Sequence, residues 1–148
     1  MNVRRELPIW LESKQRPSWD EYFKELVLLT SKRSTCHKLA VGCILVKDNR
    51  IISQGYNGYL CGLPHNPIIR DGHNIGTIHA EQNAIIDCAK RGVSCDGAIA
   101  YITHYPCINC FKFLYMGGIK DIKYIYDYNN DTEINNLLKL TSININKI

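Results

Sequence analysis

The feature that most restricts how this chain can fold is a pair of short motifs, H-x-E at residues 79–81 and P-C-x-x-C at residues 106–110. One imidazole and two thiols can hold a single zinc ion, provided that the fold brings the two motifs together. Three protein ligands leave the fourth zinc position open, which distinguishes a catalytic zinc from a structural one. The sequence therefore predicts a metal site made by His79, Cys107 and Cys110.

Both motifs stand at predicted helix starts. A helix over 79–91 is stopped by Gly92, and a helix over 107–116 is closed by Gly117. The N-terminus of a helix carries a partial positive charge, which lowers the pKa of a thiol and favours the thiolate that zinc binds. We therefore expect the two helix starts to converge on one ion.

Elsewhere the chain alternates between helical and extended patterns. The predicted helices lie at 18–32, 79–91, 107–116 and 132–139, and the predicted strands at 41–47, 51–55, 98–103, 121–126 and 143–146. The strands at 98–103 and 121–126 flank one helix through short links, so they are expected to run parallel. The stretch 56–78 is predicted to be a long loop, which in a compact domain is usually functional. These patterns predict an α/β fold, with a single domain over 1–148 and its core at about 18–140.

Composition excludes several classes of protein. The 148 residues carry a net charge of +4 with Lys and Arg scattered, whereas polymeric nucleic acid usually demands a clustered basic face. The sequence has no apolar run long enough to cross a membrane, and its basic start lacks the apolar stretch of a secretory signal. Seven cysteines, an odd number, indicate reduced thiols rather than a secreted disulfide framework. We expect a cytoplasmic protein that binds a small anionic ligand, with neither polymeric nucleic acid nor a membrane as its partner.

Glu81 gives the metal site its predicted chemistry. An H-x-E motif followed by P-C-x-x-C is the pattern of zinc-dependent nucleobase deaminases. Zinc lowers the pKa of its bound water to about 7, and the resulting hydroxide would attack C4 of a cytosine or C6 of an adenine while Glu81 moves the protons. The alternative is a structural zinc knuckle, but such a site normally closes with four ligands. The H-x-E half favours the catalytic interpretation.

Beyond the zinc motifs, the chain resembles the deoxycytidylate (dCMP) deaminase family, especially its bacterial competence-operon and phage-like branch. The resemblance covers about 18–128 and includes the segments Arg33-Ser34-Thr35-Cys36 and Gly55-Tyr56-Asn57-Gly58. It implies a cytidine-deaminase-like αβα sandwich, in which helices flank a mixed five-stranded sheet. It also implies hydrolysis of dCMP to dUMP and ammonia, which supplies dUMP for dTMP synthesis.

The resemblance further implies a set of substrate-binding residues. They are Asn57, Ala80, Tyr105, Tyr128, Arg33, Ser34 and Thr35. Asn57 matches an asparagine beside the nucleotide sugar, and the backbone of Ala80 would contact the base. The segment 33–35 would contact the phosphate, by its position and chemistry rather than by a strict motif. The tyrosines would stack on the base or bind the nucleotide. Simpler interpretations stay open: Asn57 suits a left-handed turn, the tyrosines suit packing, and Arg33 suits a helix C-terminus.

The resemblance also concerns a second metal, assembly and regulation. Many relatives hold a second, structural zinc, and its candidate ligands here are Cys36, Cys61, His65 and His73. Alternatively these are loop residues with no shared ligand, because the cysteine-rich insertion of the relatives is largely missing. The family further implies a homohexamer that is activated by dCTP and inhibited by dTTP, with Mg²⁺, at subunit interfaces.

Other functions compete with dCMP deamination. The runner-up is another zinc deaminase, acting on dCTP as well as dCMP, on cytidine, on tRNA, on guanine or on a riboflavin precursor. A tRNA editor should carry a denser basic surface, whereas the 33–35 segment favours a terminal phosphate. The third hypothesis is a non-catalytic zinc scaffold, which would have no need of Glu81.

Overall fold

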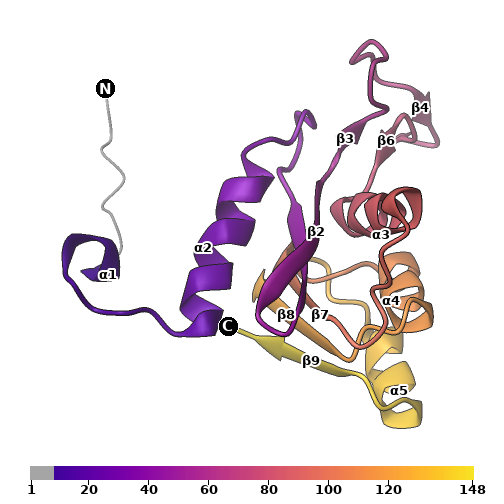
Figure 1. Cartoon of the computed structure of the whole chain (residues 1–148). Helices are drawn as coiled ribbons and strands as arrows, with labels where there is room; N and C mark the ends of the chain where they lie inside the picture. Colours follow the sequence, from indigo (N-terminus) through magenta and orange to yellow (C-terminus); the bar gives the residue numbers. More distant parts are fainter. Residues whose placement is uncertain (1–8) are drawn as a thin grey trace.

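The computed structural model describes residues 9–148, with a five-stranded sheet at its centre (Figure 1). Its strands are β1 (Gly42–Lys47), β2 (Arg50–Tyr56), β7 (Ile99–His104), β8 (Asp121–Tyr126) and β9 (Asn144–Lys147). In the order β2-β1-β7-β8-β9, β1 is antiparallel to both of its neighbours, whereas β8 is parallel to both of its own. The predicted mixed sheet, and the parallel pairing of the two strands around one helix, are thus confirmed.

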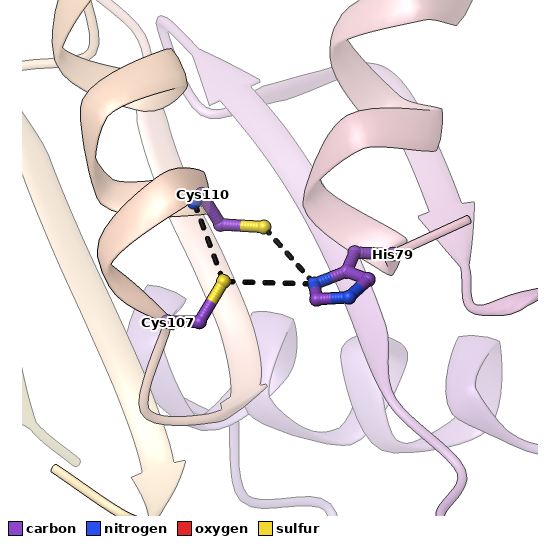
Figure 2. Close-up of side chains that lie close together, drawn as sticks. All are labelled: His79, Cys107 and Cys110. Atoms are coloured by element: carbon purple, nitrogen blue, oxygen red, sulfur yellow. Dashed lines mark hydrogen bonds between the residues drawn. The ribbon is translucent and has the colours of Figure 1, made fainter. Parts of the chain in front are cut away.

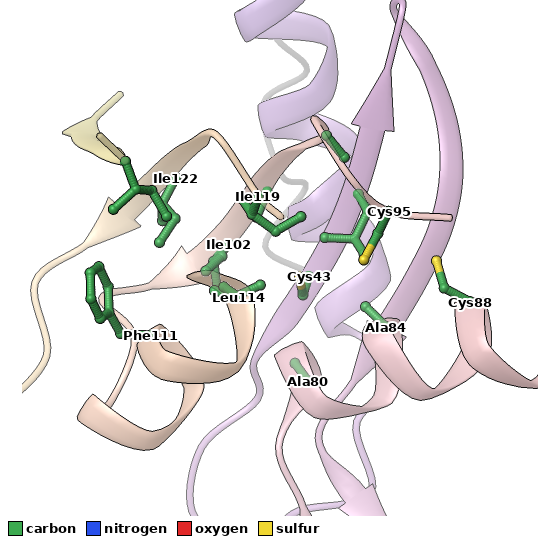
Figure 3. Packing of buried hydrophobic residues seen from close by; sticks show 14 of the residues in the cluster. Cys43, Ala80, Ala84, Cys88, Cys95, Ile102, Phe111, Leu114, Ile119 and Ile122 are labelled. Atoms are coloured by element: carbon green, nitrogen blue, oxygen red, sulfur yellow. The ribbon is translucent and has the colours of Figure 1, made fainter. Parts of the chain in front are cut away.

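Helices cover both faces of this sheet (Figure 1). The helices are α1 (Ile9–Glu12), α2 (Trp19–Ser31), α3 (Ala80–Arg91), α4 (Ile108–Met116) and α5 (Thr132–Leu140). On one face, Phe23 of α2 packs in a buried cluster with Ile44 and Tyr101 of the sheet. On the other face, Ala84 of α3 and Phe111 of α4 belong to a larger cluster (Figure 3). The predicted αβα sandwich is confirmed, and the short helix α1 is an addition to the prediction.

Helix α2 begins where its sequence predicts. The Ser18 side chain accepts a hydrogen bond from the Glu21 backbone N–H, and the Glu21 carboxylate accepts one from the Ser18 N–H. Asp20 in the same turn accepts hydrogen bonds from the Tyr101 hydroxyl at 2.6 Å and from Lys123 Nζ at 2.8 Å. The first turn is therefore held both by its own capping box and by two side chains of the sheet.

The predicted strands at 41–47 and 51–55 form a hairpin of β1 and β2. At its turn, Asp48 and Asn49 both have a left-handed backbone, with φ of 52° and 58°. A two-residue turn with positive φ at both central positions matches the right-handed twist of the flanking strands. Asp and Asn tolerate this conformation better than other side chains. The hairpin therefore follows from local turn chemistry.

The segment 56–78 is more ordered than the predicted long loop. It contains two short antiparallel ladders, β3 (Gly58–Tyr59) with β6 (Thr77–Ile78), and β4 (Ile69–Arg70) with β5 (His73–Asn74). The Asn74 side-chain amide donates a hydrogen bond to the Tyr59 hydroxyl at 3.1 Å, which joins the two ladders. Strands of two residues are too short to show an alternating pattern, so sequence periodicity does not reveal them.

The limits of the domain stay a prediction. Residues 1–8, which the predicted domain includes, lie outside the described part of the chain. Among residues 9–148, helices that are both long and apolar enough to cross a membrane are absent.

Candidate metal centre and substrate cavity

The two predicted motifs meet at the starts of α3 and α4 (Figure 2). His79 Nδ1 lies 3.3 Å from Cys110 Sγ and 3.6 Å from Cys107 Sγ. The three ligand atoms all lie within 4.8 Å of one another. In the part of the chain that the structure describes, this is the only such group of three or more His, Cys, Asp or Glu side chains. The fold thus brings together the residues predicted to bind zinc.

Helix starts position all three ligands. His79 is the N-cap residue of α3 and Cys107 is the N-cap residue of α4. Cys110 lies in the first turn of α4, and its backbone N–H donates a hydrogen bond to Cys107 Sγ at 3.4 Å. A thiolate at this place is stabilised by the helix dipole and by the N–H groups that the first turn leaves unpaired.

The three side chains also govern one another's protonation. A hydrogen bond with Cys110 lowers the pKa of Cys107 to about 4, and contact with His79 lowers it as well. The shared hydrogen bond raises the pKa of Cys110 in turn. The thiolate of Cys107 raises the pKa of His79 above its usual value. Cys107 is therefore a thiolate at neutral pH, which is the form that zinc binds.

The spacing of these atoms fits a zinc ion. Zn–S bonds of about 2.3 Å and Zn–N bonds of about 2.0 Å at tetrahedral angles place N and S about 3.5 Å apart. The observed separations from His79 Nδ1 are 3.3 and 3.6 Å. An imidazole nitrogen with two cysteine sulfurs is also a donor set that suits zinc rather than magnesium or calcium. The residues present therefore fit the metal that the motifs predict.

Glu81 lies in the first turn of α3 and is buried, with 4% of its surface exposed. Burial raises the pKa of its carboxyl group, and this outweighs the opposite effect of Cys110 and His79. On the same helix, Ala80 and Ala84 point into the core and face the sheet (Figure 3). A carboxyl group with a raised pKa, held on a tightly packed helix beside a metal site, is suited to moving protons.

A cavity of about 460 Å³ lies next to the metal ligands. Four of the predicted substrate-binding residues line it, namely Asn57, Ala80, Tyr105 and Tyr128, and Glu81 lines it as well. A cavity of this size lies in the usual range for a small-molecule site, roughly 300 to 1,000 Å³. Four of the predicted substrate-binding residues and the predicted proton shuttle thus share one cavity.

Asn57 is bound tightly within the wall of this cavity. Its Oδ1 accepts hydrogen bonds from Ser34 Oγ at 2.6 Å and from the Val41 N–H at 2.8 Å. Its Nδ2 donates a hydrogen bond to the Leu39 carbonyl at 2.7 Å. Asn57 is not among the residues with a left-handed backbone, so the simpler turn interpretation is wrong. The asparagine instead holds the segment 39–41 in place.

The predicted phosphate contacts lie outside the cavity wall. Arg33, Ser34 and Thr35 are absent from the residues that line it. The Arg33 guanidinium carbon lies 6.0 Å from the centre of the Tyr56 ring. Thr35 Oγ1 accepts a hydrogen bond from the Tyr59 N–H at 3.1 Å. These side chains serve contacts within the protein, and their binding of phosphate stays a prediction.

The candidate ligands of a second zinc do not gather into a metal-binding group among the described residues. Cys36 and His73 line the substrate cavity. The His65 ring stacks on Tyr59 at a centroid distance of 5.4 Å, and Cys61 is exposed. The second zinc stays a prediction from the family resemblance.

Three basic side chains that were not among the predicted site residues also line the cavity, His37, Lys38 and His104. His104 ends β7, its Nδ1 lies 2.8 Å from Thr103 Oγ1, and burial lowers its pKa. His37 and Lys38 are the first two residues after Cys36, and His104 directly precedes Tyr105. Their nearness to segments already singled out is the one signal that could have found them.

Comparison with known proteins assigns the chain to a family. The model of the cytidine and deoxycytidylate deaminase zinc-binding region matches residues 17–126. The chain belongs to this deaminase family. The family predicted from the sequence is confirmed, and with it the zinc-deaminase class of enzyme.

Individual relatives of this deaminase agree with that assignment. The chain is 41% identical to ComE operon protein 2 of Bacillus subtilis over 90% of its own length and 73% of that protein. It is 36% identical to deoxycytidylate deaminase of Schizosaccharomyces pombe over 88% of its length, but it spans only 44% of that enzyme. A solved structure of dCMP deaminase from the cyanophage S-TIM5, in complex with dCMP and dUMP, is 32% identical with a TM-score of 0.80. That match covers 90% of this chain and 99% of the phage chain.

Proposed function

We propose that the protein deaminates dCMP to dUMP and ammonia. The observation that carries the proposal is a cavity of about 460 Å³ lined by a buried carboxyl group, Glu81, and by two of the candidate zinc ligands, His79 and Cys107. The third candidate ligand, Cys110, has its Sγ 3.3 Å from His79 Nδ1. The cyanophage protein, named as a dCMP deaminase and solved with dCMP and dUMP, supports this substrate because nearly its whole length matches the chain. The deoxycytidylate deaminases of yeast and phage support it as well.

The metal ligands have one task in this reaction. A zinc ion held by His79, Cys107 and Cys110 would supply a Lewis acid that makes water acidic enough to react near neutral pH. The helix starts hold the three donor atoms close together, so zinc would bind without a large rearrangement of the backbone. Cys107 is already in the thiolate form that zinc binds.

Glu81 moves the protons. Its carboxylate takes a proton from the attacking water and delivers it to N3 of the cytosine ring as the new C4–O bond forms. It then carries the second proton of that water to the amino group. The C4–N bond breaks, ammonia leaves, and C4 keeps the oxygen as a carbonyl. Burial of Glu81 raises the pKa of its carboxyl group, which makes it a better proton carrier near neutral pH.

The remaining cavity residues would orient the base and sugar. The Tyr105 ring packs edge-on against Tyr124, with centroids 4.9 Å apart, so its position is fixed before substrate binds. All four line the cavity: Tyr105 would stack on the base, the Ala80 backbone would contact it, and Asn57 and Tyr128 would border the nucleotide. Fixed contacts of this kind lower the entropic cost of reaching a reactive geometry.

The test is a substrate panel with purified, zinc-loaded protein. Loss of cytosine absorbance is followed with dCMP, CMP, deoxycytidine and dCTP at equal concentrations. We expect dCMP to turn over with a kcat/KM well above that of deoxycytidine. The proposal would be contradicted if only dCTP reacted, if only deoxycytidine reacted, or if none of the four compounds reacted.

Assembly and regulation form a further part of this proposal. We expect a homohexamer, since α4 exposes the apolar side chains Phe113, Tyr115 and Met116, the last of them 80% exposed. A mass measurement by light scattering on a sizing column tests it. We also expect activation by dCTP and inhibition by dTTP with Mg²⁺, read from the same absorbance assay. A cytoplasmic location stays a prediction, which fractionation of cells would check.

A further inference from the structure

The substrate cavity offers one permanent positive charge. Among the described residues that line it, Lys38 is the only Lys or Arg. Glu81 is the one Asp or Glu on the same wall, and it is buried beside the metal ligands. A phosphate monoester carries a charge of about −1.5 to −2 at neutral pH and is recognised by cationic hydrogen-bond donors. The wall also holds imidazoles, among them His37 and His104, but the Lys38 ammonium is the one group whose positive charge is permanent at neutral pH.

The backbone on both sides of Lys38 is anchored. The Cys36 N–H donates a hydrogen bond to Ser34 Oγ at 3.1 Å. Beyond Lys38, the Leu39 carbonyl accepts a hydrogen bond from Asn57. The lysine therefore presents a mobile four-carbon stem from a fixed point in the cavity wall, which lets its point charge follow a phosphate.

Arg33, the other candidate for a cation that binds the phosphate, contacts Tyr56 instead of the cavity. Its guanidinium lies over the Tyr56 ring, and the side chain is not part of the cavity wall. Lys32, which follows α2, lines a different cavity of about 330 Å³ together with Leu28 and Tyr126. Of the three basic residues in this region, only Lys38 faces the site that holds Glu81.

We infer that Lys38 determines specificity for nucleotides over nucleosides by binding the 5′-phosphate of the substrate. The inference extends the proposed function, because it assigns the phosphate of that substrate to a residue. The role is one of recognition, so Lys38 is a specificity residue that leaves the proton transfers to Glu81.

Binding of the reaction product tests the inference separately from turnover. Titration calorimetry measures the affinity of the zinc-loaded protein for dUMP and for deoxyuridine, which differ only in the phosphate. We expect Lys38→Met to weaken dUMP binding about 10- to 100-fold, as expected for loss of a charged hydrogen bond, and to leave deoxyuridine binding unchanged. Lys32→Met, the matched removal of a cation that lines a different cavity, is the control and should keep the wild-type preference for dUMP. Arg33→Met tests the competing prediction that Arg33 binds the phosphate.

Each other outcome has a defined meaning. If Lys38→Met keeps the preference for dUMP, or if Arg33→Met abolishes it, the inference is overturned. A wild-type protein that binds dUMP and deoxyuridine equally overturns it too. A protein that prefers dUMP through Lys38 but fails to deaminate dCMP would leave the inference standing and refute the proposed reaction. Circular dichroism of each variant confirms that the fold is intact.

Discussion

Gly55 on β2 lies directly against the backbone of Ala80 at the start of α3. A Cβ atom added at Gly55 would stand 2.5 Å from the Ala80 carbonyl oxygen and 2.6 Å from the Ala84 nitrogen. Real Cβ atoms do not approach backbone this closely, so only glycine allows the helix to pack at this depth. Ala80 precedes Glu81, and the close approach therefore sets the distance of Glu81 from the sheet.

We predict that Gly55→Ala displaces the start of α3 and destabilises the protein. Overpacking of a tightly filled site costs about 1–3 kcal/mol, and the measurement is urea unfolding followed by circular dichroism. Turnover should fall as well, because Glu81 moves with the helix. The exposed neighbour Gln54 provides the control, since Gln54→Ala changes the same strand without touching α3. Unchanged stability in Gly55→Ala would mean that α3 adapts without cost.

We predict that Glu81→Gln keeps the metal and the fold but loses turnover. The amide has nearly the same shape as the carboxyl group yet cannot carry a proton, and general acid–base catalysis typically contributes about 100- to 10,000-fold. The measurement pairs kcat on dCMP with zinc content by mass spectrometry. Glu133→Gln, an exposed acid in the first turn of α5, is the control. Retention of full activity by Glu81→Gln would assign the proton transfers to another group.

We predict that Cys110→Ala loses bound zinc. Cys110 is fully buried, and its Sγ lies 3.3 Å from His79 Nδ1, so the remaining two ligands cannot close around the ion. The affinity should fall by more than the roughly 10- to 100-fold that loss of a mere supporting group costs. Competition with a chromogenic chelator measures it. Cys36→Ala should bind one zinc ion per chain. If the wild-type protein binds two zinc ions per chain and this variant binds one, the second zinc site is established.

We predict that the Asn57 side chain stabilises the cavity wall. Asn57→Ala leaves the Val41 N–H and the Leu39 carbonyl without their partner, which costs about 1–3 kcal/mol for partly buried groups. Thermal unfolding measures this loss. Ser34→Ala removes one contact of the same side chain and should cost less. Loss of dUMP affinity in Asn57→Ala without any loss of stability would instead favour a direct contact with substrate.

We predict that the contact of Asp20 with Lys123 contributes to stability only above acidic pH. Partial burial raises the pKa of Asp20, but hydrogen bonds from Lys123 and Tyr101 outweigh it and hold the pKa below its usual value. A carboxyl group with a lowered folded-state pKa contributes stability that is present above its unfolded pKa, about 3.9, and is lost as pH falls through the folded value.

The measurement is the free energy of unfolding in wild-type protein and in Lys123→Met at pH 7 and at pH 3. The half-exposed position of Asp20 limits the difference at pH 7 to roughly 0.5–1 kcal/mol, and the difference should shrink at pH 3. Lys112→Met on the surface of α4 controls for loss of a positive charge. A difference that stays constant over this pH range would show that Lys123 acts through packing alone.

Most of the sandwich follows from local sequence signals. The capping box at Ser18 marks the start of α2, and the two zinc motifs mark the starts of α3 and α4. The turn at Asp48 and Asn49 fixes the first hairpin. Caps and turns of this kind involve backbone groups only a few residues apart. They can therefore be recognised in the sequence before the tertiary fold is known.

The cavity wall was harder to predict for a physical reason. Helix α2 ends at its C-cap, Lys32, and the chain directly beyond it has no regular structure to orient its side chains. Asn57 instead holds the segment 39–41, through hydrogen bonds between residues far apart in sequence. Position along the chain pointed to the segment 33–35, which lies outside the cavity wall, and it did not single out Lys38, which lines the cavity. The short ladders of the segment 56–78 escaped prediction because two residues carry no periodicity.

The candidate metal ligands can report when the chain folds, because they come together only in the folded protein. His79 and Cys110 are 31 residues apart in sequence, and the whole of α3 and β7 lies between them. Their donor atoms meet only when both helices have docked on the sheet, so metal affinity and folding are coupled. Cobalt(II), which takes similar ligands and becomes coloured in a tetrahedral sulfur site, would therefore acquire its colour at the moment of docking. Stopped-flow refolding with cobalt would time that single event within the folding of the entire chain.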